Sequence, residues 1–377
     1  NTTSSGQVAV GFQALQFNTT GIQNLAVGFQ ALQDNTTANY NLAVGSEALN
    51  SNTTGIQNLA IGYRALAVGT DVDDSVAIGM QALENNTSSN MMAIGKEALK
   101  ANTTGANNTA LGWRTLVANT TGSGNMAIGS GALGSNITSN NNVAIGTNAL
   151  GSSTAGEENV AIGSSTLEDN TSGDYNIAIG GSSLVNNTTG NSNVGIGFRA
   201  LATSTTSSGN TAIGANVMEY TTGQGNTAIG QGSMYLNTTG ASNTAIGQST
   251  LANNTTGSNS IAIGNNALNA NTTSSSQVAI GIAALQFNTT GQSNLAIGDS
   301  ALNANTSGSV NVAIGTGSLL DNTTGSTNVA IGYAALSNNT TSNSSLAIGN
   351  QALENNTAGQ NIAIGAQAGR NNTTGAI

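Results

Sequence analysis

Polar and apolar positions recur along this chain with a period of about seventeen residues. Each period contains a short apolar phrase, VAIG or a close variant, and a leucine follows four residues after the phrase glycine in 19 of 22 copies. In the second copy these positions are Ala26, Val27, Gly28 and Leu32. A polar arm of the type NTTG then leads into the next phrase. A fixed period of this size is typical of stacked repeat proteins, in which each repeat contacts mainly its neighbours.

The apolar runs have the length and the residues of strands. They are short, rich in β-branched residues and bounded by glycine and asparagine, a pattern typical of strands. The central glycine and the polar arm leave no apolar stripe at helical spacing. We therefore predict an all-β fold, a parallel β-solenoid or β-roll of 22 coils, in which the phrase and the second apolar run at the leucine are both extended. Identical residues then stack about 4.8 Å apart, and asparagines form side-chain amide ladders.

The repeats run from end to end, so we predict one continuous array over residues 1–377 without a separate domain. Three intervals between phrase glycines have sixteen residues: Gly79 to Gly95, Gly214 to Gly230 and Gly349 to Gly365. They recur every 135 residues, which is eight coils. This second period indicates growth by duplication of eight-coil blocks, and a structural superhelix is the alternative interpretation.

The middle residue of the phrase is alanine in 21 of 22 copies. Successive side chains of a strand face opposite sides, so if the valine and isoleucine face the core, the alanine faces outward. An outward position that stays small predicts close packing against another chain, and a threefold bundle is one closed arrangement. Alternatively, alanine fits a tight bend within one chain. Open strand edges at both ends of the array predict end-to-end pairing of copies as a second route to self-association.

The phrase VAIGxxAL, and above all the run AIGYRALAVGTDVDDSVAIG at residues 60–79, resembles the head repeat of trimeric autotransporter adhesins, the YadA-like or haemagglutinin-type repeat. Similar repeats occur in phage tail fibres and other bacterial surface fibres. The resemblance implies a left-handed parallel β-roll that assembles as a trimer and serves in attachment. The coil of this chain is longer than that of the family, because each repeat carries the NTT arm.

Composition excludes several classes of function. Charged residues make up 6% of the chain and the net charge is −10, which excludes nucleic-acid binding through phosphate neutralisation. The sequence contains no cysteine and no histidine, so it has no disulfide framework, no Cys/His metal site and no imidazole base for a nucleophilic serine. No apolar run is long enough to span a bilayer. We expect no enzymatic activity, no cofactor, no nucleic-acid partner and no membrane span.

The NTT arm matches the acceptor pattern for N-linked glycans. In the alternative interpretation, asparagine adopts the left-handed turn geometry while threonine hydroxyls bond the local backbone. The candidate glycosylation residues share the first position of the arm and are Asn18, Asn35, Asn52, Asn102, Asn119, Asn187, Asn237, Asn254, Asn271, Asn288, Asn322 and Asn339.

Two other groups of residues are candidates for binding. Asp71, Asp73 and Asp74 replace the arm in one coil, as weak candidates for a calcium site or as a solvated acidic turn. Scattered and unstacked aromatic residues directly after the phrase glycine are candidates for contact with carbohydrate, or alternatively ordinary single surface aromatics. They are Phe12, Phe29, Tyr63, Trp113, Phe198 and Tyr333.

These features together predict an extracellular structural fibre or adhesin-like segment on a cell or virion surface, with a mechanical and surface-presenting role. Its partners would be further copies of the chain and surface glycans. One alternative is the shaft of a phage tail fibre, and a second is a filament subunit that carries N-linked glycans on the arms. Ice binding is disfavoured, because the consecutive threonines of a turn point apart.

Overall fold

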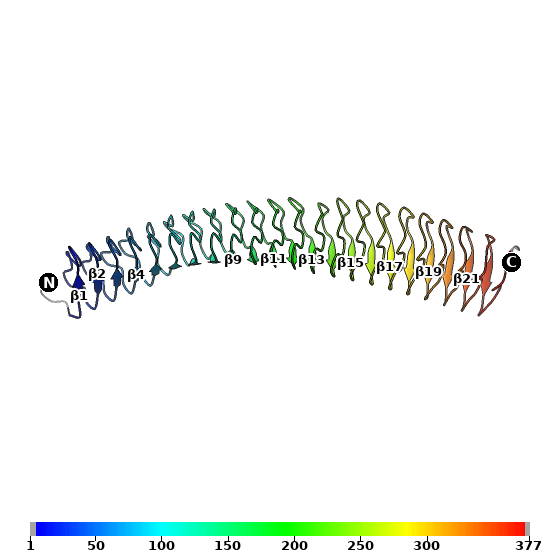
Figure 1. The fold of residues 1–377 in the computed structure, drawn as a ribbon, viewed down its shortest axis with the longest axis horizontal. Helices are drawn as coiled ribbons and strands as arrows, with labels where there is room; N and C mark the ends of the chain where they lie inside the picture. Colours follow the sequence, from blue (N-terminus) through cyan, green and yellow to red (C-terminus); the bar gives the residue numbers. More distant parts are fainter. Residues whose placement is uncertain (1–4, 374–377) are drawn as a thin grey trace. The chain divides into compact units, whose positions relative to one another are not determined.

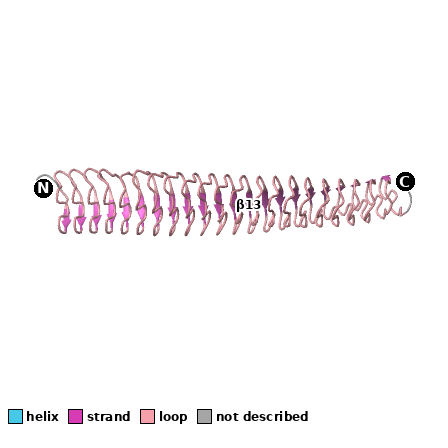
Figure 2. Ribbon diagram, turned by 90° about the horizontal axis from the view of Figure 1, so that it is seen from above, coloured by secondary structure: helices cyan, strands magenta, loops and turns pink. Residues whose placement is uncertain are grey.

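The computed structural model describes residues 5–373 of the chain. Contacts divide the chain into two units, Asn1–Asn191 and Ser192–Ile377. Each unit is a parallel β-solenoid in which every coil contributes one three-residue strand (Figures 1 and 2). No helix occurs within residues 5–373. The predicted fold class and the period of about seventeen residues are confirmed, whereas the single continuous array over residues 1–377 stays a prediction.

The strands of the first unit follow one another along one side of its coils (Figure 1). Their bounds are β1 Val8–Val10, β2 Leu25–Val27, β3 Leu42–Val44, β4 Leu59–Ile61, β5 Val76–Ile78, β6 Met92–Ile94, β7 Thr109–Leu111, β8 Met126–Ile128, β9 Val143–Ile145, β10 Val160–Ile162 and β11 Ile177–Ile179.

The second unit repeats the same arrangement. Its strands are β12 Val194–Ile196, β13 Thr211–Ile213, β14 Thr227–Ile229, β15 Thr244–Ile246, β16 Ile261–Ile263, β17 Val278–Ile280, β18 Leu295–Ile297, β19 Val312–Ile314, β20 Val329–Ile331, β21 Leu346–Ile348 and β22 Ile362–Ile364.

Within each unit, successive coils are stacked with identical positions opposite each other. Strands β2 and β3 pair in parallel, with Ala26 opposite Ala43. The hydrogen bonding continues beyond the strands, since the Leu32 N–H donates to the Ala48 carbonyl at 3.0 Å. Each coil is therefore bonded to the next one through both its strand and its turn, as expected for a solenoid whose repeat length equals one full circuit.

The middle alanine points into the coil in every strand from β2 to β22 except β12, which has Gly195 there, and this corrects the predicted orientation. Ala26 and Ala60 are fully buried within the single chain, whereas the flanking Ile61 is 37% exposed and Met92 is 40% exposed. The interior of the coil already holds the fully buried Leu32, which leaves space for only a small side chain on the strand. The predicted outward orientation of the alanine is therefore wrong, and the alanine needs no partner chain to bury it.

The aliphatic residues that flank the alanine point outward instead. We call their rows, the positions three and one before each repeat glycine, the strand surface. These side chains are half-buried or exposed in every strand of both units, with burial patterns such as that of β5 (Val76–Ile78). Threonine takes the first of these positions in four strands, at Thr109, Thr211, Thr227 and Thr244. The strand surface is thus a largely aliphatic run of side chains that the single chain leaves open to solvent.

The second apolar run of each repeat forms a turn, so its prediction as a strand was wrong. Leu32 lies in the left-handed region with φ 50°, and Gln30, two residues before it, has φ 54°. A left-handed conformation costs a residue with a side chain about 1–2 kcal/mol. Complete burial of a leucine contributes about 1.5–3 kcal/mol and offsets this cost. The alternation between right-handed and left-handed residues folds the segment tightly, so that both the alanine before the leucine and the leucine itself point inward.

The repeat glycine is required by the packing of one coil on the next. Gly28 has φ 141°, and a Cβ atom placed on it would lie 2.4 Å from the carbonyl oxygen of Gly45 in the following coil. Real Cβ atoms do not approach backbone oxygen so closely. The invariant glycine is therefore a condition for close stacking at this bend.

Two columns of asparagine complete the interior, and they confirm the predicted amide ladders. In the first column, the Asn35 Nδ2 donates to the Asn18 Oδ1 at 2.6 Å. In the second, the Asn24 Oδ1 accepts from the Asn41 backbone N–H at 2.9 Å, and the Asn24 Nδ2 donates to the Ala38 carbonyl at 2.7 Å. Buried amides bonded in this way satisfy the backbone groups of the arm, which the apolar residues of the core do not reach.

The three sixteen-residue intervals keep the strands in register. Val76 lies opposite Met92 across the first short interval, and Thr211 lies opposite Thr227 across the second. In these coils the polar arm is one residue shorter, and the pairing of the strands is unchanged.

Candidate functional site

The residues that differ most from coil to coil lie on one side of the turn. We call the positions one, two and five residues after each repeat glycine the turn surface. They alternate with the buried alanine and leucine at positions three and four, as in the coil of Gly28, where Ala31 and Leu32 are fully buried. Position two has a positive φ throughout, as in Gln30 and Arg64, and these two side chains are half-buried where Leu32 is fully buried.

All six basic residues of the sequence lie on the turn surface, and all six are in ion pairs. The Arg64 guanidinium lies 2.7 Å from the Glu84 carboxylate of the next coil, and Arg199 lies 2.7 Å from Glu219 in the same relation. The Glu84 and Glu219 side chains are only 5% and 3% exposed. Each basic group is thus matched to a carboxylate, so the surface offers no concentration of free positive charge.

In the described part of the chain, hollows open on the turn surface at three coils, and each is lined by a glycine at position two. These glycines are Gly131 in the first unit and Gly232 and Gly317 in the second. Every other coil carries a side chain at this position. Loss of that side chain exposes backbone between the neighbouring coils, and the hollow results.

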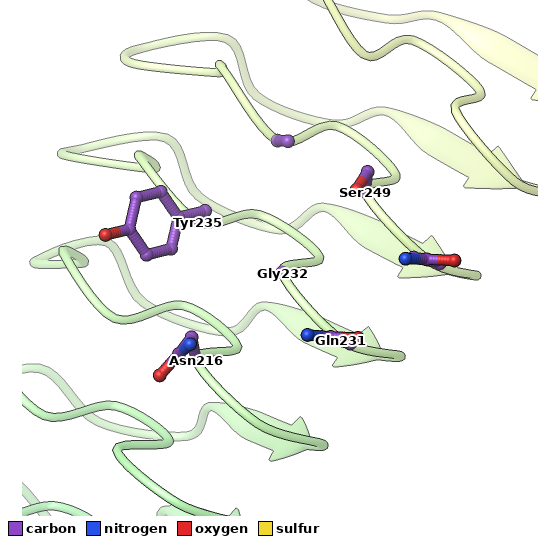
Figure 3. A pocket seen from close by; sticks show the side chains of 7 residues that line it. Asn216, Gln231, Gly232, Tyr235 and Ser249 are labelled. Carbon is purple, nitrogen blue, oxygen red and sulfur yellow. The ribbon is translucent and has the colours of Figure 1, made fainter.

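The hollow at Gly232 has a volume of about 310 Å³. Figure 3 shows the bare Gly232 between the Tyr235 ring on one side and the Gln231 side chain on the other, with Ser249 in the following coil. The ring of Tyr220 meets that of Tyr235 edge-on, with ring centres 5.2 Å apart and an interplanar angle of 86°. A hydrogen bond with Tyr220 raises the pKa of the Tyr235 phenol above its usual range. The edge-on contact with Tyr220 thus holds the Tyr235 ring in place.

The hollow at Gly317 has a volume of about 360 Å³. Tyr333, which is 58% exposed, lies at its edge. The carboxylates of Asp299 and Glu354 and the amide of Gln351 also line it. This hollow combines an aromatic face with side chains that accept hydrogen bonds.

The hollow at Gly131 has a volume of about 270 Å³ and contains the only tryptophan of the sequence, Trp113. The Arg114 guanidinium carbon lies 5.7 Å from the centre of the indole ring, a cation–π contact that orients the ring. Trp113 is nevertheless 54% exposed, and Asn148 of a neighbouring coil also lines the hollow.

The candidate glycosylation asparagines lie inside the coils. Asn119 is fully buried, and its Nδ2, the atom that a glycan would modify, donates to the Asn102 Oδ1 at 2.7 Å and to the Gly122 carbonyl at 2.9 Å. In the folded coil this atom is therefore buried and hydrogen-bonded, and glycosylation at these residues stays a prediction. The same buried position is occupied by Asn18, Asn35, Asn52, Asn102, Asn187, Asn237, Asn254, Asn271, Asn288, Asn322 and Asn339.

The aspartates at residues 71–74 do not assemble a calcium site. No group of three or more acidic residues suited to a metal ion occurs in the described part of the chain. Asp73 instead accepts a hydrogen bond from the Ile56 backbone N–H at 2.8 Å, while Asp71 and Asp74 are exposed. The three residues form an acidic turn.

The aromatic residues after the repeat glycine are less scattered than the sequence suggested. Phe12 and Phe29 stack across neighbouring coils, with ring centres 5.6 Å apart and an interplanar angle of 12°. The expectation that these rings are unstacked is therefore wrong for this pair. Trp113 and Tyr333, by contrast, stand beside hollows.

Sequence reasoning missed the hollows, although a signal for them was present. Position two carries a glycine in three coils and a longer side chain in most others. A comparison of that one column along the chain would have singled out Gly131, Gly232 and Gly317 among the many glycines of the sequence.

No family model matches the chain, and no curated protein matches it either. The YadA-like resemblance thus stays a prediction that rests on the repeated phrase. Among the described residues, none belongs to a helix of the length and hydrophobicity needed to cross a membrane.

Proposed function

We propose that the chain is a segment of an extracellular structural fibre, adhesin-like in its surface, which spans distance and presents a repetitive polar face. The observation that carries this proposal is the continuous hydrogen bonding between coils in each unit. Every coil adds the same backbone ladder, the same buried leucine and the same pair of amide columns. Load along such a stack is shared among equivalent bonds, and proteases find few irregular loops.

The strand surface supports self-association of the chain as part of this function. It presents aliphatic side chains such as Ile229 and Ile246, each 37% exposed, and Ile261, which is 41% exposed. Soluble monomers rarely expose contiguous apolar patches of more than a few hundred Å². We therefore propose that this surface packs against a further copy of the chain, in a trimer or another closed assembly.

The area of the strand surface can be compared with that of a stable protein–protein interface. The strands of one unit, about 4.8 Å apart and about 10 Å long, cover roughly 500 Å². A stable interface of standard size buries about 800 Å² on each partner. The strand surface of one unit is smaller than such an interface.

The proposal is tested by placing an ion pair on the strand surface. Ile229→Lys with Ile246→Glu puts opposite charges on directly paired residues of β14 and β15, so the strand pairing itself is not strained by like charges. We expect the wild-type chain to have a mass in solution that is a multiple of 37.1 kDa, and the variant to approach 37.1 kDa. Analytical ultracentrifugation measures both masses.

A matched control carries the same charges elsewhere. Ser182→Lys with Ser165→Glu places them on neighbouring coils of the turn surface, where both serines have a positive φ like other position-two residues. This control is expected to keep the wild-type mass. A wild-type chain that stays at 37.1 kDa at high micromolar concentration contradicts self-association, as does an assembly that the strand-surface variant leaves intact.

A further inference from the structure

The three hollows of the turn surface share one construction. Each has a bare glycine backbone at its centre and an aromatic residue at its edge, namely Trp113, Tyr235 or Tyr333. Each also has amide or carboxylate side chains from adjacent coils. An aromatic ring beside a glycine at position two occurs in both units, so the combination is not peculiar to one coil.

The volumes limit the ligand to something small. At about 270–360 Å³ the hollows lie at the lower end of the range for small-molecule sites. A single flat ring that lies across the glycine suits this space, whereas a nucleotide or an extended peptide does not.

The side chains define the chemistry of that ring. A pyranose has an apolar face of C–H groups that stacks on an aromatic ring, and hydroxyls around its edge that donate to and accept from amides and carboxylates. In the Gly317 hollow, Tyr333 provides the aromatic face, while Asp299, Glu354 and Gln351 provide hydrogen-bond partners. In the Gly232 hollow, Tyr235 takes the same role beside side-chain amides such as that of Gln231.

The charge of the surface selects among sugars. No basic side chain lines the hollows at Gly232 and Gly317, and the chain carries a net charge of −10. Arg114 lines the Gly131 hollow, but it is already paired with the Glu97 carboxylate at 3.5 Å. An anionic sugar would meet the carboxylates of Asp299 and Glu354 without a cation to balance them. The arrangement favours uncharged sugar rings, because carboxylates bind the hydroxyls of such rings well.

We propose that the hollows at Gly131, Gly232 and Gly317 are subsites for the neutral pyranose rings of a glycan. Each subsite binds one ring through its aromatic residue and its hydrogen-bonding side chains. Affinity at one subsite is low, with a Kd of about 1 mM, and a polysaccharide that occupies several subsites binds more tightly by multivalency. The subsites belong to the turn surface, so sugar binding does not require self-association through the strand surface.

The single tryptophan gives a direct test of one subsite. Trp113 is the only indole in the sequence, so a change in tryptophan fluorescence reports on the Gly131 hollow alone. We expect a saturable change on titration with at least one of cellobiose, maltose, lactose and diacetylchitobiose, up to about 10 mM, roughly ten times the expected Kd. Saturation-transfer NMR with the same sugars detects the tyrosine subsites. Sialyllactose serves as the anionic comparison.

Filling the hollows tests their location. Gly131→Gln, Gly232→Gln and Gly317→Gln restore a side chain that position two already carries in other coils, for example Gln30 with φ 54°. A Cβ atom on Gly317 meets nothing within 4 Å, and one on Gly232 meets only the Ser249 hydroxyl at 4.0 Å. One on Gly131 would lie 2.7 Å from the Asn148 Oδ1, which is the end of a side chain and can move aside. These variants are therefore expected to fold, as circular dichroism and thermal unfolding can verify.

We expect Gly131→Gln to abolish the fluorescence response and the triple variant to weaken saturation transfer at least tenfold. Ser182→Gln, at the same position in a coil without a hollow, is the matched control and should leave both signals unchanged. The proposal is overturned if the wild-type chain gives no response to any neutral sugar, if the triple variant binds as well as the wild type, or if only sialyllactose binds. Ultracentrifugation of the same samples reports on the fibre proposal separately, because that measurement depends on the strand surface.

Discussion

The interior amide ladder can be broken at one residue, and Asn119→Ala is the most informative change. The Asn119 Nδ2 donates to the Asn102 Oδ1 and to the Gly122 carbonyl, while its Oδ1 accepts from the Asn136 Nδ2 at 2.7 Å. Removal of the amide interrupts the ladder on both sides. The coil cannot rearrange freely, since Asn102 and Asn136 are themselves fully buried.

The size of the destabilisation follows from the polar groups that Asn119→Ala leaves without hydrogen-bond partners. The Gly122 carbonyl keeps a hydrogen bond from the Asn108 Nδ2 at 2.7 Å, and the Asn136 Nδ2 keeps one to the Ser139 carbonyl at 3.2 Å. The Asn102 Oδ1 loses its donor. A buried polar group without a partner costs about 1–3 kcal/mol. When the groups that keep only part of their hydrogen bonds are included, we expect the local stability of the coil to fall by about 3 kcal/mol. This corresponds to roughly a 150-fold change in an equilibrium constant.

Hydrogen exchange followed by mass spectrometry is the appropriate assay. Repeat stacks open locally, so a local measurement is more informative than one global free energy of unfolding. Peptides from the coils around Asn119 should exchange roughly 150-fold faster in the variant, and peptides several coils away should keep the wild-type rates. An increase confined to these coils would show that the ladder stabilises its own neighbourhood.

Two control variants make the result decisive. Asn338→Ala removes an exposed amide whose Nδ2 donates to the Asn355 Oδ1, and its effect should stay within about 0.5 kcal/mol. Thr121→Ala destroys the acceptor pattern that begins at Asn119 but leaves the ladder untouched. If Asn119→Ala proves as mild as Asn338→Ala, or if Thr121→Ala is equally harmful, the ladder does not have the role assigned to it.

Three further outcomes test the packing in each coil by chemical denaturation. Gly28→Ala should cost more than 3 kcal/mol because its Cβ would meet backbone, whereas Gly317→Ala, with open space around it, should cost only about 1–2 kcal/mol for its positive φ. Leu116→Ala should cost about 2–5 kcal/mol, and Leu116→Gly should be no worse despite its smaller size, because glycine tolerates the φ of 51°. Arg199→Ala should cost about 2 kcal/mol, since it leaves the Glu219 carboxylate buried and unpaired, and addition of Glu219→Gln should restore most of the loss.

The repeat made much of the fold predictable. A period that matches one circuit places each residue over its counterpart, so the parallel register and the asparagine ladders follow from spacing alone. The orientation of the strand could not be predicted from the spacing. Alternation of side chains places the alanine and its neighbours on opposite faces of the strand, but it does not show which face is inside. Ala26 and Val27 are both apolar, and only the narrow interior beside Leu32 decides between them.

The turn was harder to predict for a different reason. A buried leucine with a positive φ contradicts ordinary backbone preference, and the contacts that compensate for it come from neighbouring coils. The hollows depend on the same long-range stacking. Gly317 is an ordinary glycine in the sequence, and it becomes distinctive only when the coils on either side place Tyr333 and Asp299 next to it.

The shortened arms have a practical consequence for engineering. Loss of one residue leaves Leu346 and Ile362 paired across β21 and β22, so the length of the arm and the pairing of the sheet vary independently. That independence is what a host for grafted peptides requires. A foreign epitope inserted into one arm would be displayed without a shift of the strands. Inserts in adjacent coils would stand only about 4.8 Å apart, so crowding between them, and not folding, would set the usable density.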